Sequence, residues 1–132
     1  MKCLIVEDDP ISSQILGRMI SRYGTSDVTV NGKEGIDQFR QAHESNSPYD
    51  LILMDIMMPG VNGLQAVQTM REIEATMNIS VKQRVKIIMT TALDDPRTVM
   101  KALYESDASS YLIKPIKLQR LEGELRTLKL IP

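Results

Sequence analysis

The sequence predicts an α/β fold in which helices cover both faces of a parallel sheet. Short apolar runs, typical of buried strands, alternate with segments whose apolar residues recur every three or four positions. Such alternation is typical of repeated β-α-β units. Five strands and five helices fit the pattern, so we expect one doubly wound sheet.

The composition predicts a single globular domain. The 132 residues leave no room for a second domain, and 42% of them are apolar, enough to build a core. The formal charge is −1 and the basic residues are scattered, so we expect no direct binding of nucleic acid. No apolar run approaches the ~20 residues that span a bilayer. With one cysteine and no signal peptide, we expect a cytoplasmic protein without membrane contact.

The first half of the chain contains two strands and two helices. Residues 3–6 form the first strand, and Asp9 followed by Pro10 indicates the cap and first residue of a helix. A short strand at about 27–30 and a helix capped by Asn31 follow. The apolar stripe of the first helix consists of Ile11, Ile15, Leu16, Met19 and Ile20.

The second half continues the alternation. Strands are predicted at 51–55, 85–90 and 110–113, and helices at about 64–77, from about 94, and at 118–128. The third helix places either Met70 or Arg71 inward, and the fourth places Val99, Met100 and Leu103 inward. The connection at 78–84 is long for a compact domain.

Polar side chains follow four of the predicted strands at their carboxyl ends. In open α/β sheets, ligands bind at this edge, so we expect these side chains to form one site. They are Glu7 and Asp8 after the first strand, Asp55 at the end of the third, Thr90 and Thr91 at the fourth, and Lys114 after the fifth.

Taken together, these motifs resemble the receiver domain of two-component response regulators over essentially the whole chain. The matching elements are Val6-Glu7-Asp8-Asp9, Asp55 with Met58-Pro59 and Asn62-Gly63, Thr91-Ala92, and Lys114-Pro115. The resemblance implies a flavodoxin-like (βα)5 fold with strand order 2-1-3-4-5. It also implies that residues 1–132 form one response regulatory domain with no output domain in this chain.

By this resemblance Asp55 accepts a phosphoryl group from a phosphohistidine of a sensor histidine kinase or a histidine phosphotransfer protein. Unit like charges ~4 Å apart repel by roughly 4 kcal/mol at an effective dielectric of 20, so clustered carboxylates imply a cation. Oxygen ligands favour Mg²⁺, and Mn²⁺ should substitute. The implied metal ligands are Glu7, Asp8, Asp55 and the backbone carbonyl of Met57. We expect Asp9 to cap the helix instead of binding metal.

The resemblance assigns further roles around the phosphoryl group. Lys114 and Thr91 carry over as catalytic and phosphate-binding residues, with Ala92 offering its backbone N–H. Thr91 and Tyr111 carry over as a switch that changes the face formed by the fourth helix, fifth strand and fifth helix. A cis peptide bond before Pro115 aims Lys114 into the site. Pro59 and Gly63 carry over as structural residues of the loop after Asp55.

Two other functions compete with this interpretation. A Mg²⁺-dependent aspartyl-phosphate phosphohydrolase would use similar residues but needs a second acid where Met57 stands, so we expect a phosphoacceptor and not a turnover enzyme. A receiver-like binding domain that works without phosphorylation is the other alternative. Pro10, Ile11 and Ile15 are candidates for contact with the phosphoryl donor, and the sole histidine, His43, is expected to be an ordinary helix residue. The downstream effector is open, as is the choice between a monomer and a phosphorylation-dependent dimer.

Overall fold

The computed structural model describes residues 1–58, 60–92 and 96–132. Within them, five strands form one parallel sheet in the order β2-β1-β3-β4-β5, as predicted. The strands are β1 (Lys2–Val6), β2 (Thr25–Thr29), β3 (Leu51–Asp55), β4 (Lys86–Thr91) and β5 (Ser110–Ile113). Every neighbouring pair is parallel, so all five carboxyl ends meet at one edge of the sheet.

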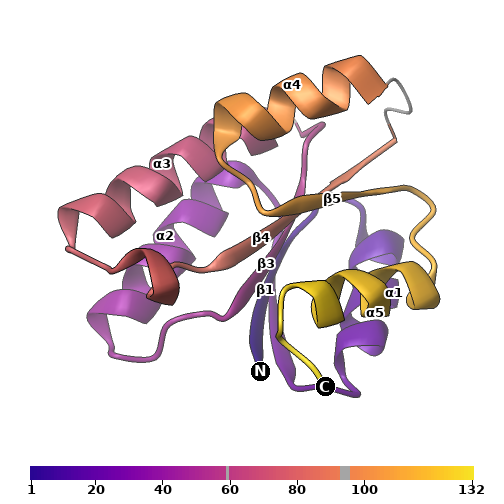
Figure 1. The fold of residues 1–132 in the computed structure, drawn as a ribbon, viewed down its shortest axis with the longest axis horizontal. Helices are drawn as coiled ribbons and strands as arrows, with labels where there is room; N and C mark the ends of the chain where they lie inside the picture. Colours follow the sequence, from indigo (N-terminus) through magenta and orange to yellow (C-terminus); the bar gives the residue numbers. More distant parts are fainter. Residues whose placement is uncertain (59, 93–95) are drawn as a thin grey trace.

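Helices cover both faces of this sheet (Figure 1). They are α1 (Pro10–Ile20), α2 (Gly32–Glu44), α3 (Gly63–Thr76), α4 (Pro96–Ser106) and α5 (Leu118–Thr127). Two apolar clusters separate the layers: α1 and α5 pack on one face, and α2, α3 and α4 pack on the other. The fold is therefore the predicted doubly wound (βα)5 arrangement.

The central strands are buried on both sides because their side chains alternate between the two clusters. In β3, Ile52 and Met54 belong to the cluster under α2 and α3, whereas Leu51 and Leu53 belong to the cluster under α1 and α5. All five residues of β3 are buried, which explains why the sequence shows a continuous apolar run there instead of an alternating one.

Several predicted boundaries and faces were wrong. Strand β2 spans Thr25–Thr29 and not 27–30, because this edge strand buries only Thr29 and so lacks an apolar signal. In α1, Leu16 and Ile20 are buried, but Ile11 is 69% exposed and Ile15 47% exposed. In α4, Val99 is buried, whereas Met100 is 59% exposed instead of facing inward.

Three helices, α1, α2 and α3, begin at the carboxyl edge with side-chain caps. Asp9 accepts hydrogen bonds from the backbone N–H and the hydroxyl of Ser12, so it is the predicted cap of α1. Asn62 and Gln65 form a reciprocal capping box at the start of α3. The predicted start of the fourth helix at 94–95 and the structural role of Pro59 lie outside the described residues.

The long connection after α3 contains a 3-10 turn, η1 (Val81–Gln83), at the opposite edge of the sheet from these caps. Among the described residues, no helix is both long enough and apolar enough to cross a membrane.

Candidate functional site

The strand order brings the predicted site residues to one edge of the sheet. Glu7 directly follows β1, Asp55 is the last residue of β3, Thr91 is the last of β4, and Lys114 directly follows β5. Because β1, β3, β4 and β5 are consecutive neighbours, these ends form one row. The register pairs Asp55 with Thr90, so the two ends lie level.

Three carboxylates gather in this row. Glu7, Asp8 and Asp55 each offer an oxygen atom, and the three oxygens all lie within 4.8 Å of one another. Glu7 is 2% exposed and Asp55 is 4% exposed, whereas Asp8 is exposed to solvent. Two buried acids and one open acid repel one another strongly unless a cation lies between them.

Lys114 supplies one positive charge. Its Nζ lies 2.9 Å from Oε1 of Glu7 and 3.5 Å from Oδ2 of Asp55. Burial alone would lower the pKa of Lys114, but the hydrogen bond to Glu7 and the nearby charges outweigh it, so the pKa is raised. One ammonium against three carboxylates leaves the cluster with excess negative charge.

Glu7 shows the imbalance most clearly. Burial and the neighbouring Asp55 carboxyl raise its pKa from 4.5 to about 7, while Lys114 opposes the shift. Its second oxygen, Oε2, is buried and has no hydrogen-bond partner among the described residues. An oxygen-only donor set with an unsatisfied buried carboxylate oxygen fits a hard cation such as Mg²⁺.

The loop after β3 holds Asp55 in place. The backbone N–H of Met57 donates to Oδ1 of Asp55 at 3.2 Å, and the Met57 side chain is 63% exposed. At Gly63, an added β-carbon would lie 2.2 Å from the carbonyl oxygen of Asp55, so only glycine lets α3 begin this close to the strand.

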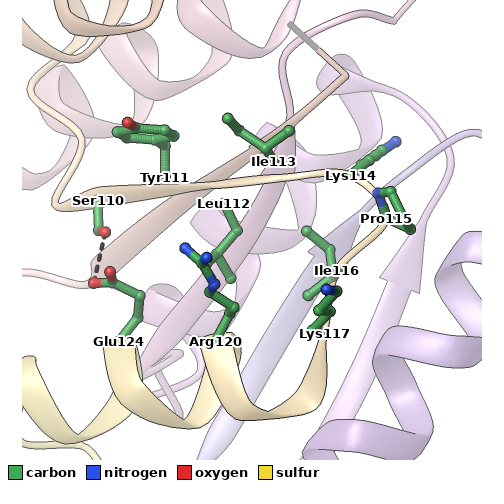
Figure 2. A pocket seen from close by; sticks show the side chains of 10 residues that line it. All are labelled: Ser110, Tyr111, Leu112, Ile113, Lys114, Pro115, Ile116, Lys117, Arg120 and Glu124. Carbon is green, nitrogen blue, oxygen red and sulfur yellow. Dashed lines mark hydrogen bonds between the residues drawn. The ribbon is translucent and has the colours of Figure 1, made fainter. Parts of the chain in front are cut away.

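The residues predicted to sense a phosphoryl group lie on β4 and β5. Thr91 is fully buried, and its carbonyl oxygen accepts a hydrogen bond of 2.7 Å from the backbone N–H of Lys114. Ala92 follows in an exposed position. Tyr111 is half-buried against the cluster under α2, α3 and α4, toward the other end of β5 from Lys114 (Figure 2). The Lys114–Pro115 peptide bond is cis.

Two cavities border the site. One of about 320 Å³ lies between α1 and the β5–α5 loop, where Ile15, Lys114 and Ile116 are among its lining residues. Another, of about 440 Å³, runs along β5 and α5, with Tyr111, Lys117 and Arg120 among its lining residues (Figure 2). The sequence singled out Ile15 and Tyr111 but not Ile116, Lys117 and Arg120. These three residues belong to no motif, and they line the cavities only because of how α5 and the loop before it pack.

The chain belongs to the response regulator receiver domain family, whose sequence model matches residues 3–126. It is therefore a phosphorelay signalling domain, and its family is not one of classical enzymes.

Curated relatives come from two kinds of protein. The chain is 30% identical to the two-component response regulator 24 of Arabidopsis thaliana, over 97% of this chain and 84% of that protein. It is 35% identical to the hybrid signal transduction histidine kinase G of Dictyostelium discoideum, over 92% of this chain but 3% of the kinase. It is 27% identical to the osmosensing histidine protein kinase SLN1 of Saccharomyces cerevisiae, again over 92% of this chain, and spans 10% of that kinase.

Solved structures agree on the fold. The receiver domain of the histidine kinase CKI1 from Arabidopsis thaliana, complexed with Mg²⁺ and BeF3⁻, superposes with a TM-score of 0.83 at 23% identity, over 97% of this chain and 89% of that one. A putative response regulator from Chloroflexus aurantiacus superposes with a TM-score of 0.78 at 26% identity, over 96% and 95% of the two chains.

Proposed function

We propose that Asp55 is the phosphoacceptor of this receiver domain. The observation that supports this most strongly is its position: a carboxylate, 4% exposed, at the end of a buried strand, beside two other acids and a lysine. A carboxylate oxygen of Asp55 attacks the phosphorus of a phosphohistidine. The bond between phosphorus and the histidine nitrogen breaks, and that nitrogen keeps the electron pair.

We propose that Glu7, Asp8 and Asp55, with the backbone carbonyl of Met57, hold the Mg²⁺ that this transfer requires. The unpartnered Oε2 of Glu7 and the excess negative charge of the cluster support this assignment. A bound divalent cation would offset the repulsion between Asp55 and the incoming phosphoryl group. Mn²⁺ should substitute, since it accepts the same oxygen ligands.

Lys114, Thr91 and Ala92 are the proposed contacts to the phosphoryl oxygens. The Lys114 ammonium lies 2.9 Å from Glu7 and would be free to contact a phosphoryl oxygen if the Glu7 carboxylate held a metal ion instead. The Thr91 hydroxyl and the Ala92 backbone N–H then provide neutral donors. Pro115 and Gly63 shape the two loops that hold these groups in place.

The output of the site is a change in the face formed by α4, β5 and α5. Thr91 and Tyr111 are the proposed switch residues, because β4 and β5 are paired and Tyr111 packs between the sheet and the helices. This face exposes Met100, Tyr104 and Ile113, of which Tyr104 is 91% exposed. It is where we place an effector, or a second copy in a phosphorylation-dependent dimer.

The donor is a sensor histidine kinase or a histidine phosphotransfer protein, which we place in the cytoplasm with this domain. Ile15 and Lys114 line the cavity between α1 and Ile116, and Ile11 of the same helix is also exposed, so a donor helix seated there would bring its histidine toward Asp55. The free, buried thiol of Cys3 is consistent with a reducing compartment.

The test is phosphorylation by acetyl phosphate followed by intact mass. We expect one phosphoryl adduct on the wild type, dependent on Mg²⁺, and none on Asp55→Asn. Asp50→Asn, which removes an exposed acid outside the cluster, is the matched control and should be phosphorylated normally. An adduct on Asp55→Asn would contradict the assignment.

The same samples separate the two competing functions. Turnover of a small phosphate ester by the unmodified protein would favour a phosphohydrolase, which we do not expect with Met57 in place of a second acid. An unmodified wild type that still binds Mg²⁺ would favour a binding domain that works without phosphorylation.

A further inference from the structure

A third cavity, larger than the two that border the acid cluster, lies at the opposite edge of the sheet. Its volume is about 700 Å³, within the range of small-molecule pockets. It is lined by the ends of α2 and α3, the start of β4 and the connection that contains η1. The unusually long connection of residues 78–84 forms one wall of this cavity. The phosphoacceptor site does not involve this segment.

The cavity has a positive lining. Lys82, Arg84 and Lys86 all line it, and Asp50 is the one acid among its described lining residues. The Asp50 carboxylate accepts a hydrogen bond of 2.8 Å from the backbone N–H of Lys2, which partly satisfies it. Within the described part of the chain, none of the three cations lies within 4.0 Å of a carboxylate.

Two lining residues hold nitrogens without partners. Arg84 Nε and His43 Nε2 are both buried and have no hydrogen-bond partner among the described residues. Leaving a buried donor unpaired costs free energy, and the cost is larger for a charged group. A guanidinium that turns toward an oxyanion in the cavity recovers two charge-assisted hydrogen bonds at once.

The remaining lining is mostly apolar and aromatic. Besides the polar Asn46 and Gln83, it consists of Pro48, Tyr49, Met77, Ile79, Val85 and Leu130. Tyr49 is 4% exposed, its hydroxyl donates to Asp27 at 2.6 Å, and Lys2 Nζ lies 4.6 Å from its ring centroid. The more exposed apolar side chains of the lining include Pro48, Ile79 and Leu130. A cationic group of residues beside an apolar floor is suited to a molecule with an anionic head and an organic body.

The ends of α2 and α3 alone do not account for this arrangement. Cations near helix C-termini are favourable because the carbonyl ends carry partial negative charge. That explains the presence of basic residues, but it explains neither the open volume nor the unpaired nitrogens of Arg84 and His43.

We propose that this cavity binds a small molecule that carries a phosphate group. Arg84, with Lys82 and Lys86, holds the phosphate, and the body of the molecule lies against the apolar side chains of Pro48, Ile79 and Leu130. The site is separate from the phosphoacceptor, so it does not depend on the function proposed above.

The test uses adenosine monophosphate as the probe, with the amide and arginine side-chain signals of ¹⁵N-labelled protein as the readout. The buffer contains EDTA and has constant ionic strength, which keeps nucleotide-bound metal away from Glu7, Asp8 and Asp55. We expect saturable shifts at His43, Gln83 and Lys86 and a shift of the Arg84 Nε–H signal. Inorganic phosphate should shift the same signals more weakly, and adenosine should not.

Variants decide whether the shifts report a built site. Arg84→Gln should weaken binding about tenfold, as expected for loss of a bidentate charged contact. Lys86→Gln provides an independent variant in case Arg84→Gln alters folding. Lys101→Gln, on the exposed face of α4, is the matched control and should bind like the wild type.

The proposal is overturned if neither phosphate probe saturates, if wild type, Arg84→Gln and Lys86→Gln bind equally, or if the shifts centre on Asp55 instead of Arg84. Equal shifts with adenosine alone would also overturn it, because they would indicate binding of the apolar body without a phosphate.

Discussion

Two glutamates buried at opposite edges of the sheet have very different surroundings. Glu74, near the end of α3, is fully buried, and both of its oxygens are bonded: one to Arg71 at 2.7 Å and the other to the backbone N–H of Val85 at 2.8 Å. Glu7, at the carboxyl edge, is 2% exposed, but Oε2 has no partner and two further acids lie beside it.

The difference separates a structural acid from the acid that we propose as a metal ligand. A fully bonded buried carboxylate fixes its neighbours, and here Glu74 and Arg71 join α3 to the start of β4. A half-bonded carboxylate among other acids is costly unless something else completes it. Burial alone therefore does not mark a candidate site, whereas an unsatisfied carboxylate oxygen buried among other acids does.

The largest effect on stability should come from Glu74→Gln. The change leaves the Arg71 guanidinium without its buried counter-charge, and such breaks cost about 3 kcal/mol of unfolding free energy. Urea unfolding followed by circular dichroism measures the loss. Asp37→Asn, at the exposed Asp37–Arg40 pair, is the control and should change stability by less than ~0.5 kcal/mol. Equal losses of unfolding free energy in the two variants would contradict the structural role of the Glu74–Arg71 pair.

A steric change at the carboxyl edge should rank next. Gly63→Ala would place a β-carbon 2.2 Å from the Asp55 carbonyl oxygen, so the backbone must shift, at a cost of about 2 kcal/mol. Gly123→Ala is the control, because nothing lies within 4 Å of that position in α5, and alanine should raise stability by up to ~1 kcal/mol. Thermal unfolding of both variants tests the contrast, and a neutral Gly63→Ala would contradict it.

In the metal-free protein, Glu7 should make the free energy of unfolding depend on pH. Its folded-state pKa of about 7 lies above the usual 4.5, so the folded state binds this proton more tightly than the unfolded state does. The contribution of Glu7 to the free energy of unfolding is therefore greatest below about pH 4.5. It falls as the pH rises toward about 7, by on the order of 2 kcal/mol.

Urea midpoints between pH 5 and pH 7.5 measure this dependence. Glu7→Gln should flatten the fall, and Mg²⁺ should oppose it by favouring the ionised form. A fall of the same size in wild type and Glu7→Gln would assign it to other groups.

The smallest effect should come from the cap of α3. Asn62→Ala removes the side-chain oxygen that accepts from the Gln65 backbone N–H, while the backbone N–H of residue 62 can still donate to Gln65, and loss of such a cap costs about 1 kcal/mol. Ser80 begins η1 without a side-chain cap, so Ser80→Ala should change stability by only a few tenths of a kcal/mol. Chemical unfolding of the two variants compares them directly, and equal effects would show that the cap contributes nothing.

The sequence predicted the carboxyl-edge site because its positions follow from chain order. Once the strands alternate with helices, each residue after a strand lies at the same edge, and Glu7, Asp55 and Lys114 are marked by that rule alone. The cap at Asp9 is equally local, since it depends on the three residues that follow.

The amino edge could not be predicted in the same way. The spacing of apolar residues in α3 did not decide whether Met70 or Arg71 faces inward. In the structure Met70 is buried, and Arg71 donates hydrogen bonds to Glu74 and to the carbonyl of Val85. That contact depends on where the long connection returns the chain to β4, which no local pattern gives. The mistake at Met100 has a related cause, because periodicity gives the apolar stripe of a helix but not how much of it the sheet covers.

The most direct test of the central claim is a Mg²⁺ titration followed by amide chemical shifts. We predict saturable shifts at Asp8, Asp55 and Met57, none at Glu74 or Val85, and marked weakening in Asp55→Asn. Absence of saturation, or the same binding in wild type and Asp55→Asn, would contradict the claim that the half-bonded cluster at the carboxyl edge is a cation site.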